Sequence, residues 1–377
     1  MNFSKKAMGI GFPFVNLQNI FGNNVIDVSN LGKAMASDSQ LKDYNLINGD
    51  VLFVRSSVKL EGVGEAALVP QTLENTTYSG FIIRFRDEYG LDNNFKRFVF
   101  GIDSVRNQIM SQATNSANKN ISQSVLENLE LAIPSKSEQQ KIGAYFSNLD
   151  YLITLHQRKY DKLVMSKKSM LEKMFPKNGQ TKPEIRFSGF IDDWEQRKLG
   201  ELGTITTGNT PSTSIPDYYS DDGIVWVTPT DICENITFES ARKLSDLGQQ
   251  VGRVVPKNTI LVTCIASIGK NTMLGNTGSF NQQINGLTPN ENKYDPYFLL
   301  TESALWSAKM KGSAAAGTMQ IVNRTEFSEL KTWLPSLIEQ QAIGAFFKQL
   351  DHLITLHQRE LEKLKKIKLS MLEKMFV

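Results

Sequence analysis

Histidine pairs with arginine in two identical pentapeptides, and this combination could in principle serve acid–base or metal chemistry. TLHQR stands at 154–158 and again at 355–359, which places His156 and His357 in matching positions. The 377-residue chain has only three histidines, and no carboxylates cluster beside these two. The pentapeptides therefore favour a structural role, with a metal or catalytic site as the competing interpretation.

Catalytic signatures are missing elsewhere in the chain. SIGKNT at 267–272 has a Gly-Lys pair but lacks both the upstream glycine and the following Ser or Thr of a phosphate-binding loop. The chain contains no Asn-Pro-Pro-Tyr or Asp-Pro-Pro-Tyr of the amino-methyltransferases, and PDYYSDD at 216–222 leads into no nuclease-like Glu-x-Lys strand. The two cysteines, Cys233 and Cys264, form no CxxC, so we expect neither a zinc site nor a disulfide framework. The sequence predicts a chain without catalytic residues, cofactor or metal of its own, although an enzyme with a degenerate motif stays open.

Polar loops carry the residue types that read base edges and hold phosphates. Asn, Gln, Ser, Thr, Lys and Arg gather at 59–65, 115–120, 206–223, 268–286 and 310–324, and such side chains donate and accept hydrogen bonds. Ordinary solvated turns have the same composition, but comparable loops occur in both halves of the chain. The candidate DNA-binding residues are Arg55, Ser57, Lys59, Lys96, Arg97, Asn118, Lys119, Thr210, Ser212, Lys270, Asn271, Asn281, Gln282, Gln283, Asn285 and Arg324.

Bulk composition narrows the class of protein only moderately. Charged residues make up 21% and the formal net charge is +3, so any basic surface must be local. No stretch of 18 apolar residues and no sustained apolar segment near the N-terminus is present, which indicates neither a membrane span nor a secretion signal. Together with the cysteine usage, this predicts a cytoplasmic protein.

A long internal repeat organises the chain. Residues 138–175 and 339–376 are identical at 26 of 38 aligned positions, and the match extends upstream to 113–135 and 314–336. Further back it weakens, with FPFVNLQNI at 12–20 resembling IVWVTPTDI at 224–232. Such self-similarity predicts a tandem duplication, with constant segments that do the same job twice and variable regions that do related but different ones.

The repeated segments predict two long helices that pair with each other. Their apolar residues alternate at spacings of four and three over about five heptads, without an internal proline. Each helix would have about 38 residues and a length of roughly 57 Å. Polar interruptions, the two histidines and Lys167 with Lys368, would fix an antiparallel register. The expected helix-pairing residues are Ile142, Phe146, Leu149, Ile153, His156, Leu163, Ile343, Phe347, Leu350, Ile354, His357 and Leu364.

The regions between the repeated segments are predicted to be β-rich. Short apolar runs such as DVLFVRSS at 50–57 and NTILVTCIAS at 258–267 are bounded by turn residues. We therefore expect an α+β fold in which two β-rich recognition domains are separated by two antiparallel coiled-coil helices. The expected boundaries are 1–135 for the first domain, 136–176 for the first helix, 177–335 for a linker and the second domain, and 336–377 for the second helix.

These features resemble the DNA-specificity subunit of type I restriction–modification enzymes over nearly the whole chain. The resemblance rests on the duplicated P-S-x-x-E-Q-Q-x-I-G segments and on WEQRKLGELGTITTGNTPS followed by YYSDDGIVWVTPTDI. It implies two target-recognition domains that each read one half of a split site in double-stranded DNA, with the helices as a spacer. Half-sites reached from one face would follow the helical repeat of DNA, about 34 Å per turn.

The resemblance also implies partners. Two methyltransferase subunits would bind S-adenosylmethionine and methylate adenine, and restriction/translocase subunits would use ATP and Mg²⁺ to cleave unmethylated DNA. This chain departs from the family at its start, because Met1 aligns with Thr213 and residues 177–212 have no counterpart in the first half. The alternative interpretation is a coiled-coil scaffold that binds other partners or ligands, which the near-neutral charge leaves open.

Overall fold

The computed structural model describes residues 8–114, 116–177, 179–315 and 321–376, and it has the α+β composition that the sequence predicts. The chain divides into two compact units. Unit 1 contains the chain up to Gln157 together with the segment from Arg359 onward, and unit 2 contains Arg158–Gln358. Each unit therefore holds one β-rich region and a part of both long helices.

Unit 1 consists of short strands and helices followed by one long helix. Its elements are β1 (Met8–Val15), η2 (Leu17–Asn19), β2 (Gly32–Ala34), α1 (Asp38–Asp43), β3 (Val51–Val54), β4 (Ser56–Ser57), η3 (Leu60–Gly62), β5 (Ala66–Leu68), β6 (Thr77–Tyr78), β7 (Ile82–Phe85), α2 (Asn93–Val99), α3 (Asp103–Ser111), β8 (Lys119–Asn120), α4 (Gln123–Glu127) and the first part of α5 (Lys136–Lys173). The last part of α9 (Leu337–Met375) also belongs to this unit.

Unit 2 repeats the main strands of unit 1 in the same order, with additional strands at its start and one helix in place of α2 and α3. Its elements are β9 (Glu195–Lys198), η4 (Leu199–Glu201), β10 (Gly203–Thr207), η5 (Pro216–Tyr218), β11 (Tyr219–Val227), β12 (Ile236–Thr237), β13 (Lys243–Leu244), α6 (Asp246–Val251), β14 (Ile260–Thr263), β15 (Asn271–Leu274), β16 (Gly278–Phe280), β17 (Ile284–Pro289), α7 (Pro296–Ala315), α8 (Arg324–Glu329) and β18 (Lys331–Leu334). The end of α5 and the start of α9 complete the unit.

Three strands of the central sheet repeat in the two units. In unit 1, β3 lies between β5 and β7, and in unit 2, β14 lies between β15 and β17 in the same antiparallel registers. Both central strands, VLFV and ILVT, are fully buried, as expected for runs of β-branched and large apolar residues. The turn before each strand has a residue with positive φ, Gly49 and Asn258, and these are residue types that tolerate this conformation.

The second small sheet also repeats, including its irregularity. The order β2-β1-β6 in unit 1 corresponds to β13-β11-β16 in unit 2. The register of β1 shifts between Met8 and Phe12, and that of β11 shifts between Tyr219 and Ile224. This shared shift confirms the alignment of Phe12 with Ile224 and therefore the tandem duplication.

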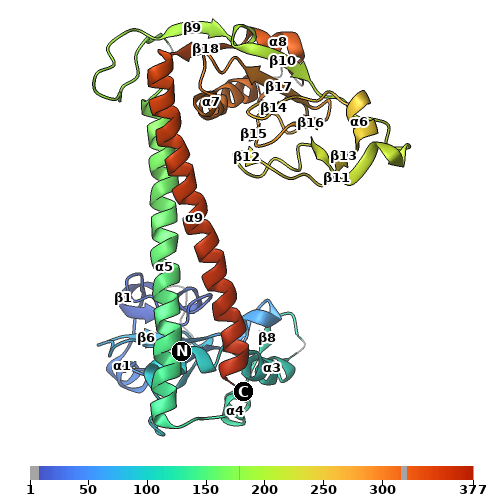
Figure 1. Cartoon of the computed structure of the whole chain (residues 1–377). Coiled ribbons are helices and arrows are strands. Elements are labelled where there is room, and N and C mark those ends of the chain that lie inside the picture. Colours follow the sequence, from blue (N-terminus) through green and yellow to red (C-terminus); the bar gives the residue numbers. More distant parts are fainter. Residues whose placement is uncertain (1–7, 115, 178, 316–320, 377) are drawn as a thin grey trace. The chain divides into compact units, whose positions relative to one another are not determined.

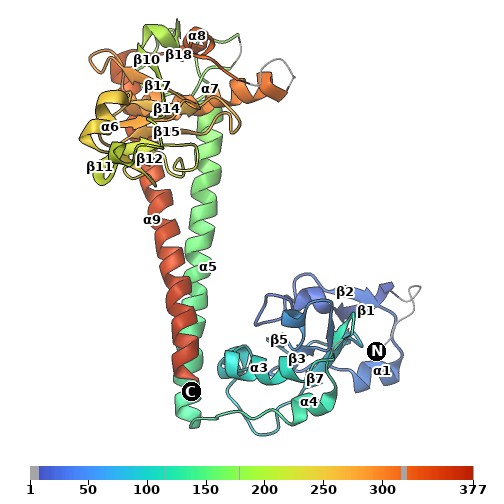
Figure 2. The same cartoon turned by 90° about the vertical axis from the view of Figure 1, so that its right-hand side faces the viewer.

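The two long helices run antiparallel in each unit, and Figures 1 and 2 show them side by side there. In unit 1, Lys368 of α9 forms an ion pair with Asp150 of α5. In unit 2, Lys167 of α5 forms the corresponding ion pair with Asp351 of α9. These are matching positions of the repeat, so the predicted polar interruption at Lys167 and Lys368 is an ion-pair position that specifies one register.

Unit 2 contains two strands at its start, one that extends the central sheet and one that forms a separate sheet with β18. β10 pairs antiparallel with β17, so the central sheet has the order β10-β17-β14-β15-β12. β9 pairs antiparallel with β18 as a separate two-stranded sheet. Within the described part of unit 1, the central sheet ends at β7, and the segment 130–133 that corresponds to β18 is not a strand.

Candidate DNA interface

Pairing of β4 with β8 brings together candidate DNA-binding residues of unit 1 that are distant in the sequence. Ser57 lies opposite Lys119, and the amide of Ile121 donates a 3.0 Å hydrogen bond to the carbonyl of Arg55. Arg55, Lys59 and Asn118 are exposed, whereas Ser57 and Lys119 are half-buried. Five of the candidate residues thus gather beside one strand pair, because β4 and β8 join the loop after β3 to the loop before α4.

Two clefts open beside this strand pair. Ser57, Lys59 and Asn118 line a cleft of about 530 Å³, and Arg55 lines another of about 630 Å³. The other residues of the first cleft are Leu17, Phe21, Ser56, Val58, Glu61, Gly62, Glu65 and Phe81, and those of the second are Tyr44, Tyr78, Gly80, Ile82, Ile83, Arg84, Ser122 and Gln123. Mixed basic, amide and aromatic linings of this kind can both bind phosphate and pack against bases or sugars.

Phe21 and Phe81 are residues of the first cleft that the sequence analysis did not single out. Their exposed fractions are 37% and 54%, which is high for large aromatic side chains. The neighbouring Glu65 is engaged, since its Oε2 accepts a 2.9 Å hydrogen bond from the amide of Gly22. A phenylalanine in a β-rich region is predicted to be a core residue, so the sequence alone gave no signal for these two.

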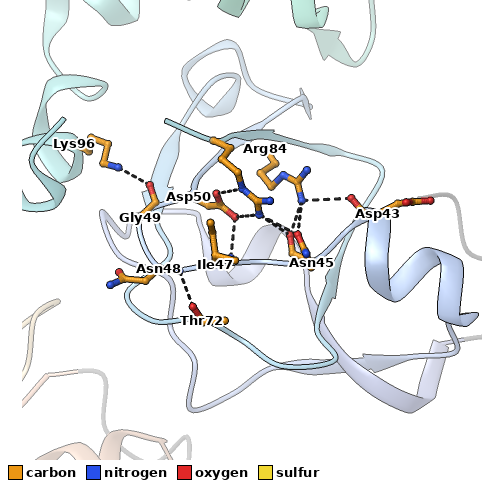
Figure 3. A network of polar contacts seen from close by, with 10 residues as sticks. Asp43, Asn45, Ile47, Asn48, Gly49, Asp50, Thr72, Arg84 and Lys96 are labelled. Carbon is orange, nitrogen blue, oxygen red and sulfur yellow. Dashed lines mark hydrogen bonds and ion pairs between the residues drawn. The ribbon is translucent and has the colours of Figure 1, made fainter. Parts of the chain in front are cut away.

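Lys96 and Arg97 do not lie on an exposed face, contrary to the expectation that they meet phosphates. Lys96 is 4% exposed, and its Nζ donates a 2.8 Å hydrogen bond to the carbonyl of Gly49 and pairs with Asp87 at 3.3 Å. Figure 3 shows this ammonium directed at Gly49 inside the domain. The buried cation holds α2 against the turn before β3 and is not available to a ligand.

Arg97 fastens α2 to the long helix. Its Nη1 donates to Ser147 Oγ at 3.0 Å, and its Nη2 lies 3.4 Å from Asp150 Oδ2. Burial lowers the pKa of Arg97 from its usual value, and the Asp150 carboxylate opposes that shift. The side chain is 18% exposed, so its charge contributes to the contact between α2 and α5.

Two of the four residues in the Asn/Gln cluster of unit 2 are internal. Asn285 is 2% exposed, and its Nδ2 donates to the Val322 carbonyl at 3.1 Å and lies 3.2 Å from Cys264 Sγ. Asn281 is 8% exposed and donates to Gln283 Oε1 at 3.1 Å. Asn281 therefore shapes the loop between β16 and β17, whereas Asn285 of β17 ties that strand to Val322 and Thr207, and neither faces a ligand directly.

The exposed residue of the Asn/Gln cluster, Gln282, contacts the loop before η5. Gln282 is exposed and accepts a hydrogen bond from Thr210 Oγ1, while Gln283 is half-buried. Arg253, which the sequence analysis did not select, is exposed next to them and donates a 2.6 Å hydrogen bond to the carbonyl of Thr207. A small polar face with one guanidinium results at this end of β10.

The remaining candidates of unit 2 are dispersed. Lys270 is exposed and donates a 3.1 Å hydrogen bond to the Pro229 carbonyl, and the half-buried Asn271 on β15 donates to Ser303 Oγ. Ser212 lies exposed in the loop before η5. Arg324 is exposed at the start of α8, at the position of the repeat that Gln123 occupies beside the second cleft of unit 1.

The expected helix-pairing residues differ in burial along the helices. In unit 1, Ile142, Phe146 and Leu149 join the core with Leu364, whereas in unit 2 Ile343 and Phe347 join the core and Leu350 is also buried. The other five, nearer the middle of each helix, are half-buried, namely Ile153, His156, Leu163, Ile354 and His357. Aromatic contacts dominate at the helix ends, where Phe376 lies 5.7 Å from Phe146 and Phe175 lies 6.0 Å from Phe347 between ring centroids.

A glutamine at the start of each long helix joins the helix to its β-rich domain. The side-chain nitrogen Nε2 of Gln139 donates to the Pro134 carbonyl at 2.9 Å, and its Oε1 accepts from the backbone amide of Asp92 at 3.0 Å. Gln340 makes the same two bonds, to Pro335 at 2.9 Å and from Asp295 at 3.1 Å. Both ends of the side-chain amide are satisfied, which explains the repeated E-Q-Q motif as a structural joint.

Across the described ranges, no group of three or more His, Cys, Asp or Glu side chains is arranged to hold a metal ion. Those ranges also contain no helix that is long and apolar enough to cross a membrane. Burial raises the pKa of the Cys264 thiol to about 11, so this cysteine is a weak nucleophile at neutral pH.

This fold defines a class of protein, namely a duplicated binding protein in which each β-rich domain has one polar face. The family described as the type I restriction modification DNA specificity domain matches residues 1–165 and 191–366. The chain therefore belongs to this family, whose members are the non-catalytic, DNA-recognising specificity subunits of type I restriction–modification systems. Membership decides against both the scaffold and the self-contained enzyme.

Relatives and solved structures agree with this assignment. A Methanocaldococcus jannaschii protein assigned as the MjaX specificity subunit of a type I restriction enzyme is 24% identical over 374 residues, which cover 95% of this chain and 85% of that protein. The HindI specificity subunit of Haemophilus influenzae is 28% identical over 171 residues, 43% of this chain and 37% of that protein. The type I restriction–modification S subunit from M. genitalium has the same fold, with a TM-score of 0.59 at 16% identity over 100% of this chain and 92% of that one.

Proposed function

We propose that units 1 and 2 each read one half of a split target in double-stranded DNA, and that the chain directs adenine methylation and restriction by partner subunits. The observation that carries the proposal is the repetition of one recognition fold with different loops on a repeated pair of helices. Two equal folds with unequal reading surfaces suit a target whose two halves differ in sequence.

In unit 1, the proposed reading face is the β4–β8 pair and its two clefts. Arg55, Lys59 and Lys119 would contact phosphates, which supply affinity and orientation but little sequence preference. Ser57 and Asn118 would contact base edges, since hydroxyl and amide groups can both donate and accept. The exposed Phe21 and Phe81 would pack against sugar or base surfaces.

In unit 2, the proposed face is formed by Thr210, Gln282 and Gln283, with Arg253 for phosphate. Ser212, Lys270 and Arg324 are exposed and would contact the flanking backbone. The buried Asn281 would act indirectly, by fixing the loop that presents Gln282, and the buried Asn285 would hold β17 in place.

The partners in this proposal are two methyltransferase subunits and, in the complete complex, restriction/translocase subunits. S-adenosylmethionine, ATP and Mg²⁺ would be bound by those partners and not by this chain. Because the complex would act on chromosomal DNA, we place it in the cytoplasm.

The experiment is to co-express the chain with its methyltransferase partner and to map adenine methylation across a genome. The expected result is one bipartite motif with a fixed spacer between its halves. Methylation at random positions, or no methylation by a stably assembled complex, would contradict the proposal. The isolated chain is the control and should transfer no methyl group.

A further inference from the structure

In unit 2, the loop after β10 approaches the end of β16 more closely than a side chain would allow. Gly208 is buried, and its amide donates a 3.1 Å hydrogen bond to the Ile284 carbonyl. A Cβ atom at this glycine would lie 2.2 Å from the carbonyl oxygens of both Phe280 and Asn281. Only glycine fits so close an approach, so the loop begins in direct contact with the segment that leads to Gln282.

Asn209 follows this glycine and ties three separate segments together. Its backbone amide donates a 3.0 Å hydrogen bond to the Phe280 carbonyl, and its carbonyl accepts one of 3.1 Å from Trp226 Nε1. Its side-chain Nδ2 donates to the Val251 carbonyl at 2.8 Å, and its Oδ1 accepts from the backbone amide of Arg253 at 2.8 Å. Each polar group of Asn209 therefore has a partner within unit 2.

Thr210 is exposed between two fixed residues. On its other side, the carbonyl of the buried Pro211 accepts a 2.7 Å hydrogen bond from the Tyr219 hydroxyl. The rings of Tyr219 and Trp226 lie 5.9 Å apart, edge to face, so these two side chains of β11 hold the loop from one side. Thr210 Oγ1 donates to Gln282. The backbone on both sides of Thr210 is thus fastened, and the threonine orients the glutamine beside it.

Arg253 is placed by the same asparagine. Its backbone amide binds Asn209 Oδ1, and its Nη1 donates a 2.6 Å hydrogen bond to the carbonyl of Thr207, the last residue of β10. Both ends of Arg253 are therefore attached to the chain immediately before and at Asn209. The guanidinium and the hydroxyl of Thr210 are held in one arrangement, although they come from segments that lie about forty residues apart.

We propose that Asn209 is a positioning residue for the reading face of unit 2, which sets base preference in one half of the target without contacting DNA. The inference rests on the proposed function, because it needs unit 2 to read a half-site. Phosphate contacts fix where a protein lies on DNA, and base contacts then specify sequence. The Asn209 amide fixes Arg253, the phosphate contact, relative to Thr210 and Gln282, the base contacts. Without this link, the phosphate contact would no longer determine which base edge the other two meet.

The test measures methylation by the complex of the full chain with its methyltransferase partner, on duplexes that carry the motif or a single base change in either half. Gln282→Ala identifies the half that unit 2 reads. Asn209→Ala removes both side-chain hydrogen bonds and should lower discrimination in that half by about tenfold, with the other half unchanged. Asn209→Asp keeps the acceptor for Arg253 and should lose only about threefold. Asn290→Ala is the matched control, because this exposed asparagine lies just after the other end of β17, and it should change nothing.

A combined variant shows whether Asn209 acts through its neighbours. In a chain that carries both Thr210→Ala and Arg253→Ala, Asn209→Ala should lower discrimination by less than about twofold further. A full additional loss there, an equal loss in both halves, or unchanged discrimination in Asn209→Ala would overturn the proposal. Urea unfolding followed by tryptophan fluorescence shows whether unit 2 is folded, and if Asn209→Ala does not fold, unchanged discrimination in Asn209→Asp would overturn it. A wild-type complex without a bipartite motif would instead refute the proposed function, and this inference with it.

Discussion

At the scale of single residues, a fully buried carboxyl group in unit 2 opposes folding at high pH. Glu302 of α7 is 3% exposed, and its Oε1 accepts a 3.1 Å hydrogen bond from the Trp333 amide. Burial raises the pKa of Glu302 to about 8. Between the ordinary pKa of a glutamate and about 8, the folded chain thus retains a proton on Glu302 that the unfolded chain has released.

The stability of unit 2 should therefore fall as the pH rises from about 5 to about 8, by up to about 1.4 kcal/mol per pH unit. Glu302→Gln keeps an acceptor for Trp333 and removes the titration, so it should flatten this dependence. All four tryptophans belong to unit 2, so urea unfolding followed by tryptophan fluorescence reports this unit. Glu234→Gln, at an exposed site, should leave the slope unchanged, and an unchanged slope in Glu302→Gln would refute the assignment.

At the scale of elements, the pairing of α5 with α9 combines apolar ends with an ion pair in each unit. Lys167 and Asp351 are 29% and 11% exposed in unit 2, and Asp351 Oδ2 also accepts a 3.0 Å hydrogen bond from the Tyr297 hydroxyl. Partial burial and a second donor hold the carboxylate in place, which makes this pair more favourable than a solvated one.

A double-mutant cycle with Lys167→Ala and Asp351→Ala should give a coupling free energy of about 0.5–1 kcal/mol in unit 2. The matched control is Lys182 with Asp193, which are 52% and 62% exposed and should couple by less than about 0.3 kcal/mol. Tryptophan fluorescence in a urea titration measures both cycles. Equal coupling in the two pairs would show that partial burial and the Tyr297 hydroxyl do not strengthen the ion pair on the helices.

At the scale of the whole molecule, two different reading faces on one chain predict separable effects on the target. Lys59→Ala in unit 1 should weaken DNA binding by the assembled complex and lower the slope of its salt dependence by about one. Gln282→Ala in unit 2 should relax base preference in one half of the motif only. Binding titrations at several salt concentrations and methylation maps measure these effects, with the exposed Lys42→Ala as control. Loss of preference in both halves after a single substitution would contradict independent reading.

The duplication and the long helices could be predicted from the sequence, because both depend on local repetition and periodicity. The reading faces could be predicted only in part. Lys96 and Asn285 have the residue types of a nucleic-acid surface, yet tertiary contacts with Gly49 and Val322 bury them. Phe21 and Phe81 deviate in the opposite direction, since these two apolar side chains are exposed at a cleft and not packed in the core. Burial of this kind is decided by the packing of distant segments, which no window of sequence contains.

The glutamine joint has a genetic consequence. Gln139 and Gln340 attach each β-rich domain through the same two backbone groups, and these contacts involve none of the loops that differ between the units. The two helix segments are identical at 26 of 38 residues, so each helix offers its β-rich domain the same joint. An exchange at these segments would replace one whole reading domain while preserving its attachment. If units 1 and 2 read separate half-sites as proposed, an exchanged domain would bring a different half-site while its attachment to the helix stays the same.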